Sequence, residues 1–174
     1  MTKHPSGIRQ DIVDKVMARR GSLYAFPQIE PQKTALVVID LDLGTGRGDI
    51  QRVNRVAQHV NDLATALRDQ RGVVAWVTTP VQKATENFRA VFGEEQTKRY
   101  ESDAKSGKSK TIWPELEVRE DDLHAVKGGH SAFFPGRSNL HEQLQAKGIT
   151  TLLIVGAVTN VCCEASARDA AELQ

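Results

Sequence analysis

Three residues of types that do chemistry follow three separate apolar stretches of the chain. Asp40 ends the stretch "TALVVID", Lys127 ends "DLHAVK", and Cys162 lies shortly after "TTLLIVGA". A thiol becomes a nucleophile when a base takes its proton, and a carboxylate held beside an ammonium group can be that base. These residue types indicate nucleophilic catalysis by cysteine, provided that the fold brings them together.

The segment "AVTNVCC" places Cys162 in or beside the first turn of a helix. Unpaired N–H groups and the positive end of the helix dipole favour a thiolate there. We therefore expect the pKa of the Cys162 thiol to lie below its usual value of about 8.5. The same N–H groups are suited to hold an oxyanion.

The elements that must position these residues follow from the apolar spacing. Apolar stretches are typical of strands buried on both faces, as in parallel sheets; here they cover residues 34–40, 73–80 and 150–157. A shorter extended piece ends at Lys127. Apolar residues at spacings of three and four predict a helix from Val53 to Leu67, which Gly72 follows as a stop.

This alternation of strands and helices predicts an α/β fold. We expect a doubly wound, mainly parallel, Rossmann-like sheet with helices on both faces, in three layers. Asn139 and Glu142 indicate a capping box that opens a further helix. Ligands bind such sheets at the carboxyl ends of the strands, so Asp40, Lys127 and Cys162 are expected at one edge.

Two other regions give weaker patterns. Residues 81–122 mix charges, turn formers and aromatic residues, and we expect irregular helical turns there that form part of a lid and set substrate specificity. Apolar residues from Ile8 to Met17 share one helix face, so residues 1–30 are predicted to be a helical arm that packs on a partner subunit in a homo-oligomer. Residues 31–174 are predicted to form the main domain. Its last helix carries no stop signal, so we expect the domain to be truncated at its C-terminus.

Composition narrows the choice of partners. The 174 residues suit one domain, and 23 Lys and Arg against 22 Asp and Glu give no basic field for nucleic acid. A small-molecule substrate is the better expectation. The sequence has no run of about 20 apolar residues for a membrane span. The only cysteines are the neighbours Cys162 and Cys163, which predict no disulfide framework and favour a cytoplasmic setting.

From about Thr34 onward the chain resembles the isochorismatase-like cysteine hydrolases. The similarity rests on "ALVVID", "VKGGHSAF" and the long motif "LLIVGAVTNVCCEASARDA". It implies a triad with Asp40 as general base, Lys127 as its electrostatic partner and Cys162 as nucleophile. It also implies hydrolysis of a C–N bond in a small amide or ureide through a thioester, without a redox cofactor.

The resemblance implies further site features. A cis peptide bond is expected between Val158 and Thr159, next to the N–H groups that receive the oxyanion. Side chains near the triad are candidates for substrate binding; they are Asp42, Thr79, Trp113, His130, Phe133 and Asn160. The nicotinamidase branch of the family binds a metal through an Asp-x-His set and a further His. Neither "DLGTGRGD" nor "TTPVQKATE" contains that set, so we expect no metal and no other cofactor.

Three alternatives remain open at this level. "DLDLGTG" is similar to the "DLDGT" motif of aspartyl phosphatases, but Leu43 is an extra residue and that chemistry gives Cys162 no role. "GTGRGD" is similar to a dinucleotide loop, but Asp49 stands where the third glycine is needed. A catalytically silent binding or assembly protein on the same fold is the third alternative, because many family members carry Gln or Asn at the position of Asp42.

Overall fold

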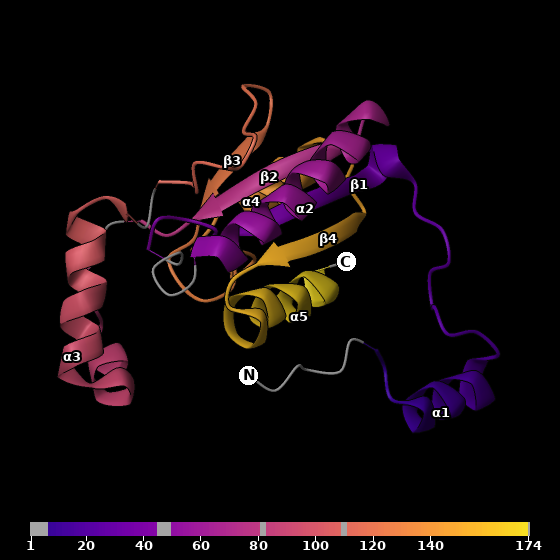
Figure 1. Cartoon of the computed structure of the whole chain (residues 1–174), viewed down its shortest axis with the longest axis horizontal. Helices are drawn as coiled ribbons and strands as arrows, with labels where there is room; N and C mark the ends of the chain where they lie inside the picture. Colours follow the sequence, from indigo (N-terminus) through magenta and orange to yellow (C-terminus); the bar gives the residue numbers. More distant parts are fainter. Residues whose placement is uncertain (1–6, 45–49, 81–82, 109–110, 174) are drawn as a thin grey trace.

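The computed structural model describes residues 7–44, 50–80, 83–108 and 111–173, which include a four-stranded parallel sheet. Its strands lie in the order β3-β2-β1-β4 (Figure 1). They are β1 (Thr34–Ile39), β2 (Val73–Thr78), β3 (Leu123–Val126) and β4 (Thr151–Gly156). The chain winds from β1 outward to β3 and then returns to the other side of β1, so the winding reverses between β1 and β4.

Alternate residues of β1 enter two separate hydrophobic cores, because successive side chains of a strand point to opposite faces of the sheet. Leu36 and Val38 pack in the core under α2 (Ile50–Asp69). Val37 and Ile39 pack in the opposite core, with residues of α4 (Leu140–Ala146) and α5 (Glu164–Leu173). Figure 1 shows α2 in front of the sheet and α4 behind it. The expected three-layer α/β architecture is confirmed.

The N-terminal helix forms where the apolar spacing predicts it. Helix α1 (Gln10–Arg20) ends at Gly21, which adopts the left-handed conformation with φ of 71° that suits glycine. None of the α1 residues is buried, and Figure 1 shows the helix apart from the sheet. A short 3₁₀ turn, η1 (Pro31–Lys33), then leads into β1.

The segment expected to form irregular turns instead contains a long helix. Helix α3 (Glu86–Lys105) has 20 residues and is kinked at Gly93, and the Thr85 side chain caps its N-terminus by accepting a hydrogen bond from the Phe88 N–H. Only Thr97 and Ala104 of this helix are buried. The prediction was wrong because the segment has no apolar stripe, whereas its Glu, Lys, Arg and Ala residues favour a helix.

Helix α4 begins at the predicted place but without the predicted capping box. The Asn139 side chain makes no capping hydrogen bond, and the Ser138 hydroxyl accepts one from the Leu140 N–H instead. The serine one residue earlier thus takes the role assigned to Asn139. Within the described ranges, no helix combines the length and the apolar character needed to cross a bilayer.

Candidate active site

The structure brings Asp40, Lys127 and Cys162 together at one edge of the sheet. Lys127 Nζ lies 2.8 Å from Asp40 Oδ2 and 3.6 Å from Cys162 Sγ. It also donates a hydrogen bond of 3.0 Å to the carbonyl oxygen of Gly129. The side chains of Lys127 and Asp40 are 3% and 13% exposed, so this ion pair is largely shielded from water.

The sheet fixes the backbone of all three residues. Asp40 directly follows β1, and its N–H donates to Val77 O, which continues the pairing with β2. Lys127 directly follows β3, and its N–H donates to Thr78 O. Cys162 lies beyond β4 on η4 (Thr159–Cys163), one turn of π-helix that continues into α5. The three residues therefore meet at the carboxyl ends of the strands, where the winding reverses.

Thr79 joins the two charged members of this group. Its hydroxyl lies 3.2 Å from Asp40 Oδ1 and donates to it, and it accepts from Lys127 Nζ at 3.4 Å. The carboxylate of Asp40 is therefore held at both oxygens, by Thr79 at Oδ1 and by Lys127 at Oδ2. Thr79 was expected to bind substrate, and the structure places its hydroxyl between Asp40 and Lys127.

The loop after Lys127 is closed on itself by Arg137. The Gly128 N–H donates to the carbonyl oxygen of Arg137, and the Arg137 guanidinium donates back to the carbonyl oxygen of Gly128. A Cβ atom at Gly128 would lie 3.2 Å from Arg137 Nε, so glycine suits this close approach. The loop is thereby held beside the ammonium of Lys127.

The turn before Cys162 begins at Gly156, the last residue of β4. Its φ of 135° belongs to the region that favours glycine, and a Cβ atom there would overlap the carbonyl group of Ile39. The cis peptide bond expected between Val158 and Thr159 lies one residue earlier, between Ala157 and Val158. That earlier bond joins the end of β4 to η4, because Thr159 already belongs to the π-helical turn.

Burial changes the expected ionisation of the Cys162 thiol. Burial first, and then the charge of Asp40 and a hydrogen bond to it, raise the pKa of Cys162 to about 11, while Lys127 acts in the opposite direction. The expected low thiol pKa was wrong, because burial and the charge of Asp40 outweigh the effects that favour the thiolate. For Lys127, burial lowers the pKa, but the Asp40 charge and hydrogen bond outweigh it and raise the pKa above its ordinary value of 10.5.

The other substrate-binding candidates lie in different surroundings. Asp42 is 5% exposed, and its backbone forms an isolated antiparallel β-bridge with Ile112. Trp113 donates from its indole N–H to Asn54 Oδ1 at 2.8 Å, which fixes the ring against α2. His130 and Asn160 are exposed, whereas Phe133 is 4% exposed and belongs to the core beneath α4 and α5. Its surroundings therefore give Phe133 a packing role.

Sequence reasoning did not single out Ser166 or Asn54. Ser166 is fully buried, accepts from the Ala132 N–H and donates to the carbonyl oxygen of Cys162. A signal was available, because Ser166 lies one helical turn after Cys162 in a segment otherwise rich in alanine. The contact between Asn54 and Trp113 joins residues 59 positions apart, and no local sequence pattern predicts it.

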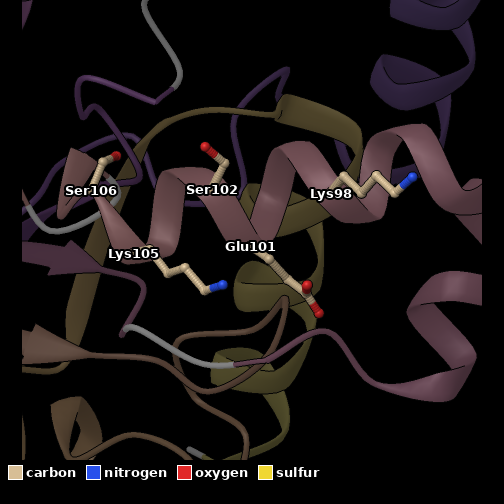
Figure 2. Close-up of a pocket in the computed structure, with 5 residues that line it drawn as sticks. All are labelled: Lys98, Glu101, Ser102, Lys105 and Ser106. Carbon is tan, nitrogen blue, oxygen red and sulfur yellow. The ribbon is translucent and has the colours of Figure 1, made fainter.

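A separate hollow of about 530 Å³ lies along α3 (Figure 2). The residues that line it all come from this helix and its end: Lys98, Glu101, Ser102, Lys105 and Ser106. None of them is a predicted site residue. Of the loop "GTGRGD", only Gly44 lies within the described residues, so its possible use as a dinucleotide loop is outside what the structure describes.

Comparisons with known proteins match most of the chain. Residues 34–174 match the family model for the isochorismatase domain. The chain is 29% identical over 149 residues to YwoC of Bacillus subtilis, an uncharacterized isochorismatase family protein; the match covers 83% of this chain and 74% of that relative.

Two further similarities concern an enzyme and a solved structure. The chain is 25% identical over 164 residues to the ureidoacrylate amidohydrolase RutB of Acinetobacter baylyi, covering 82% of this chain and 66% of that relative. Its fold is similar to the crystal structure of a cysteine hydrolase from Pseudomonas syringae pv. phaseolicola, with a TM-score of 0.69 and 22% identity over 86% of this chain and 73% of that one.

Proposed function

Because the chain belongs to the isochorismatase family, with residues 34–174 matching its domain model, we propose that it cleaves the C–N bond of a small amide or ureide through a thioester on Cys162. One structural observation carries this proposal: Lys127 Nζ contacts both the Asp40 carboxylate and the Cys162 sulfur. The name of the relative RutB, a ureidoacrylate amidohydrolase, supports a ureide or amide as the substrate class.

In the first step Asp40 takes the proton from the Cys162 thiol. The high pKa of Cys162, about 11, keeps the resting group a thiol, so proton transfer accompanies attack on the substrate carbonyl carbon. The new C–S bond moves an electron pair onto the carbonyl oxygen. N–H groups at the start of η4, those of Thr159 and Cys162, are suited to receive this oxyanion.

In the second step the C–N bond breaks. The oxyanion collapses, and the proton held by Asp40 passes to the leaving nitrogen, which departs as ammonia or an amine and leaves a thioester on Cys162. Water then attacks the thioester carbonyl and gives its proton to Asp40. Collapse of the second oxyanion releases the acid, and the proton returns from Asp40 to the sulfur.

Lys127 has an electrostatic role in both steps. Its raised pKa keeps it an ammonium ion, and this charge lies 2.8 Å from Asp40 Oδ2. While Asp40 takes the proton of the thiol, the ammonium lies beside the sulfur, on which negative charge develops. One positive charge therefore compensates the carboxylate and the developing sulfur anion in turn.

The alternatives receive less support from this arrangement. An aspartyl phosphatase needs two accessible carboxylates, whereas Asp42 is 5% exposed and Asp40 is paired with Lys127. A silent binding protein has no need for a partly buried thiol beside a carboxylate and an ammonium, a combination that is costly to bury. The hydrolase gives all three groups a role.

A panel of small amides and ureides, assayed for release of ammonia, tests the proposal. We expect at least one compound to be hydrolysed by the wild-type chain and by Cys163→Ala, because Cys163 packs in the core beside α4 and α5. Cys162→Ala should be inactive on the same compound. Turnover by Cys162→Ala at the wild-type rate would contradict the thioester mechanism.

The proposed setting is cytoplasmic, with α1 packing on a second subunit. The support is the exposure of apolar residues on this helix, of which Ile12 is 44% and Met17 43% exposed. Replacing both with lysine should lower the oligomeric state in analytical ultracentrifugation if the arm forms the contact. An unchanged sedimentation coefficient would contradict this use of α1.

A further inference from the structure

Ser166 connects the nucleophile turn to the loop that carries Lys127. Its hydroxyl donates to the carbonyl oxygen of Cys162 at 2.7 Å and accepts from the N–H of Ala132 at 2.9 Å. Cys162 belongs to η4, whereas Ala132 belongs to the loop after β3. A single hydroxyl therefore joins two segments whose residues lie 30 or more positions apart in the sequence.

The surroundings make this hydroxyl costly to remove. Ser166 and Ala132 are fully buried, so water cannot replace the hydroxyl at either partner. Its loss would remove the hydrogen bond that the buried Ala132 N–H group donates and the one that the Cys162 carbonyl oxygen accepts. Both losses are unfavourable for groups that water cannot reach. Both groups lie near reacting atoms along the chain, because Cys162 bears the sulfur and Ala132 is five residues beyond Lys127.

We infer that Ser166 is a positioning residue that sets the distance between the sulfur of Cys162 and the ammonium of Lys127. Two further contacts hold the loop that carries Ala132. Ser131 Oγ accepts a hydrogen bond from the Phe133 N–H, and Arg137 closes the loop onto Gly128. The distance between Sγ and Nζ is 3.6 Å, so a small shift of the π-helical turn changes the effect of Lys127 on the thiol. This inference rests on the proposed hydrolase function.

Thr34 offers a matched control for a Ser166 variant. Its buried hydroxyl donates to the Glu30 carbonyl oxygen at 2.7 Å, also four residues earlier in the chain. It lies at the start of β1, at the opposite end of the strand from Asp40. Thr34→Val therefore removes a buried hydrogen bond at the end of β1 that lies away from Asp40, Lys127 and Cys162.

The test measures the rate of Cys162 alkylation by iodoacetamide across pH, with the labelled cysteine identified by mass spectrometry. Lys127 lowers the pKa of Cys162, so loosening their contact should reduce the thiolate fraction. We expect Ser166→Ala to slow alkylation about tenfold near pH 8, which corresponds to a rise of about one unit in the pKa of Cys162. Ser166→Thr should restore the rate, and Thr34→Val should leave it unchanged.

Turnover and thermal melting complete the experiment. On any hydrolysed amide, Ser166→Ala should lower kcat much more than it changes KM, whereas Thr34→Val should lower only the melting temperature. Wild-type alkylation and kcat in Ser166→Ala would overturn the positioning role. If no amide is hydrolysed by the wild type, yet alkylation falls in Ser166→Ala and recovers in Ser166→Thr, the proposed function fails while the role of Ser166 stands.

Discussion

Lys127 Nζ lies 2.8 Å from Asp40 Oδ2, and both side chains are largely buried. This contact fixes the charges of the resting site. The ammonium lies against the carboxylate, while burial and the charge of Asp40 raise the pKa of Cys162 and keep its thiol protonated. The resting site therefore contains a neutral Cys162 thiol beside Asp40, and not a preformed thiolate.

Replacing the base should separate thiol reactivity from catalysis. The Asp40 charge and hydrogen bond raise the pKa of Cys162, so Asp40→Asn should bring that pKa down from about 11. Each unit of decrease raises the thiolate fraction about tenfold near pH 8. Alkylation of Cys162 should therefore become faster, while turnover falls by about 10² to 10⁴-fold, the range for a lost general base. Slower alkylation together with lost turnover would contradict this charge arrangement.

The stability of the protein should fall at alkaline pH because of the same thiol. The folded-state pKa of Cys162 is about 11, above its ordinary value of 9.0, so the unfolded chain loses the thiol proton first. The stabilising contribution is complete below pH 9.0, decreases as pH rises and is lost by about 11. Urea denaturation should show a steeper loss over this window for wild type than for Cys162→Ala. Equal slopes would show that the thiol titrates normally.

The Thr79 hydroxyl should matter for rate more than for substrate affinity. It bridges Asp40 Oδ1 and Lys127 Nζ, and hydrogen bonds to charged groups contribute about 1.5–3 kcal/mol. We expect Thr79→Val to lower kcat about tenfold or more with little change in KM. Thr79→Ser keeps the hydroxyl and should recover most of the rate. A Thr79→Val variant that changes KM alone would instead assign Thr79 to substrate binding.

Gly156 should tolerate no side chain, in contrast to Gly148. A Cβ atom at Gly156 would overlap the Ile39 carbonyl group, whereas one at Gly148 would meet nothing within 4 Å. Gly148 has φ of 67°, so Gly148→Ala should cost about 1–2 kcal/mol through backbone conformation alone. Gly156→Ala adds a backbone clash and should cost about 4 kcal/mol or more. Chemical denaturation of both variants checks this order, and equal losses would contradict the close approach of β4 to β1.

The proximity of Asp40, Lys127 and Cys162 could be predicted from the sequence because each of them follows an extended stretch. Asp40 and Cys162 come after stretches that read as buried strands, and the doubly wound topology brings strand ends to one edge. The pKa of Cys162 could not be predicted, because it depends on how deeply the tertiary structure buries the sulfur. A helix start was visible in the sequence, but the loss of solvation was not.

Side chains on irregular segments were the hardest to place. The sequence pattern does not distinguish Phe133 from its neighbour Phe134. Phe133 is 4% exposed and Phe134 is 53% exposed, because the path of the loop turns only Phe133 into the core. Helix α3 was missed since its apolar residues follow no single face. Ser166 acts through two backbone groups. Its contact with the Ala132 N–H joins residues that are distant in the sequence, and no local sequence pattern predicts such a contact.

The covalent intermediate is the most direct test of the account. A small amide that releases ammonia should be mixed with the protein, quenched in acid during turnover, and the intact mass of the protein measured. We predict an increase equal to the acyl group of the substrate, located at Cys162 by peptide mapping and missing in Cys162→Ala. Ammonia release by a protein whose mass never changes, with Cys162→Ala equally active, would contradict the proposed thioester chemistry.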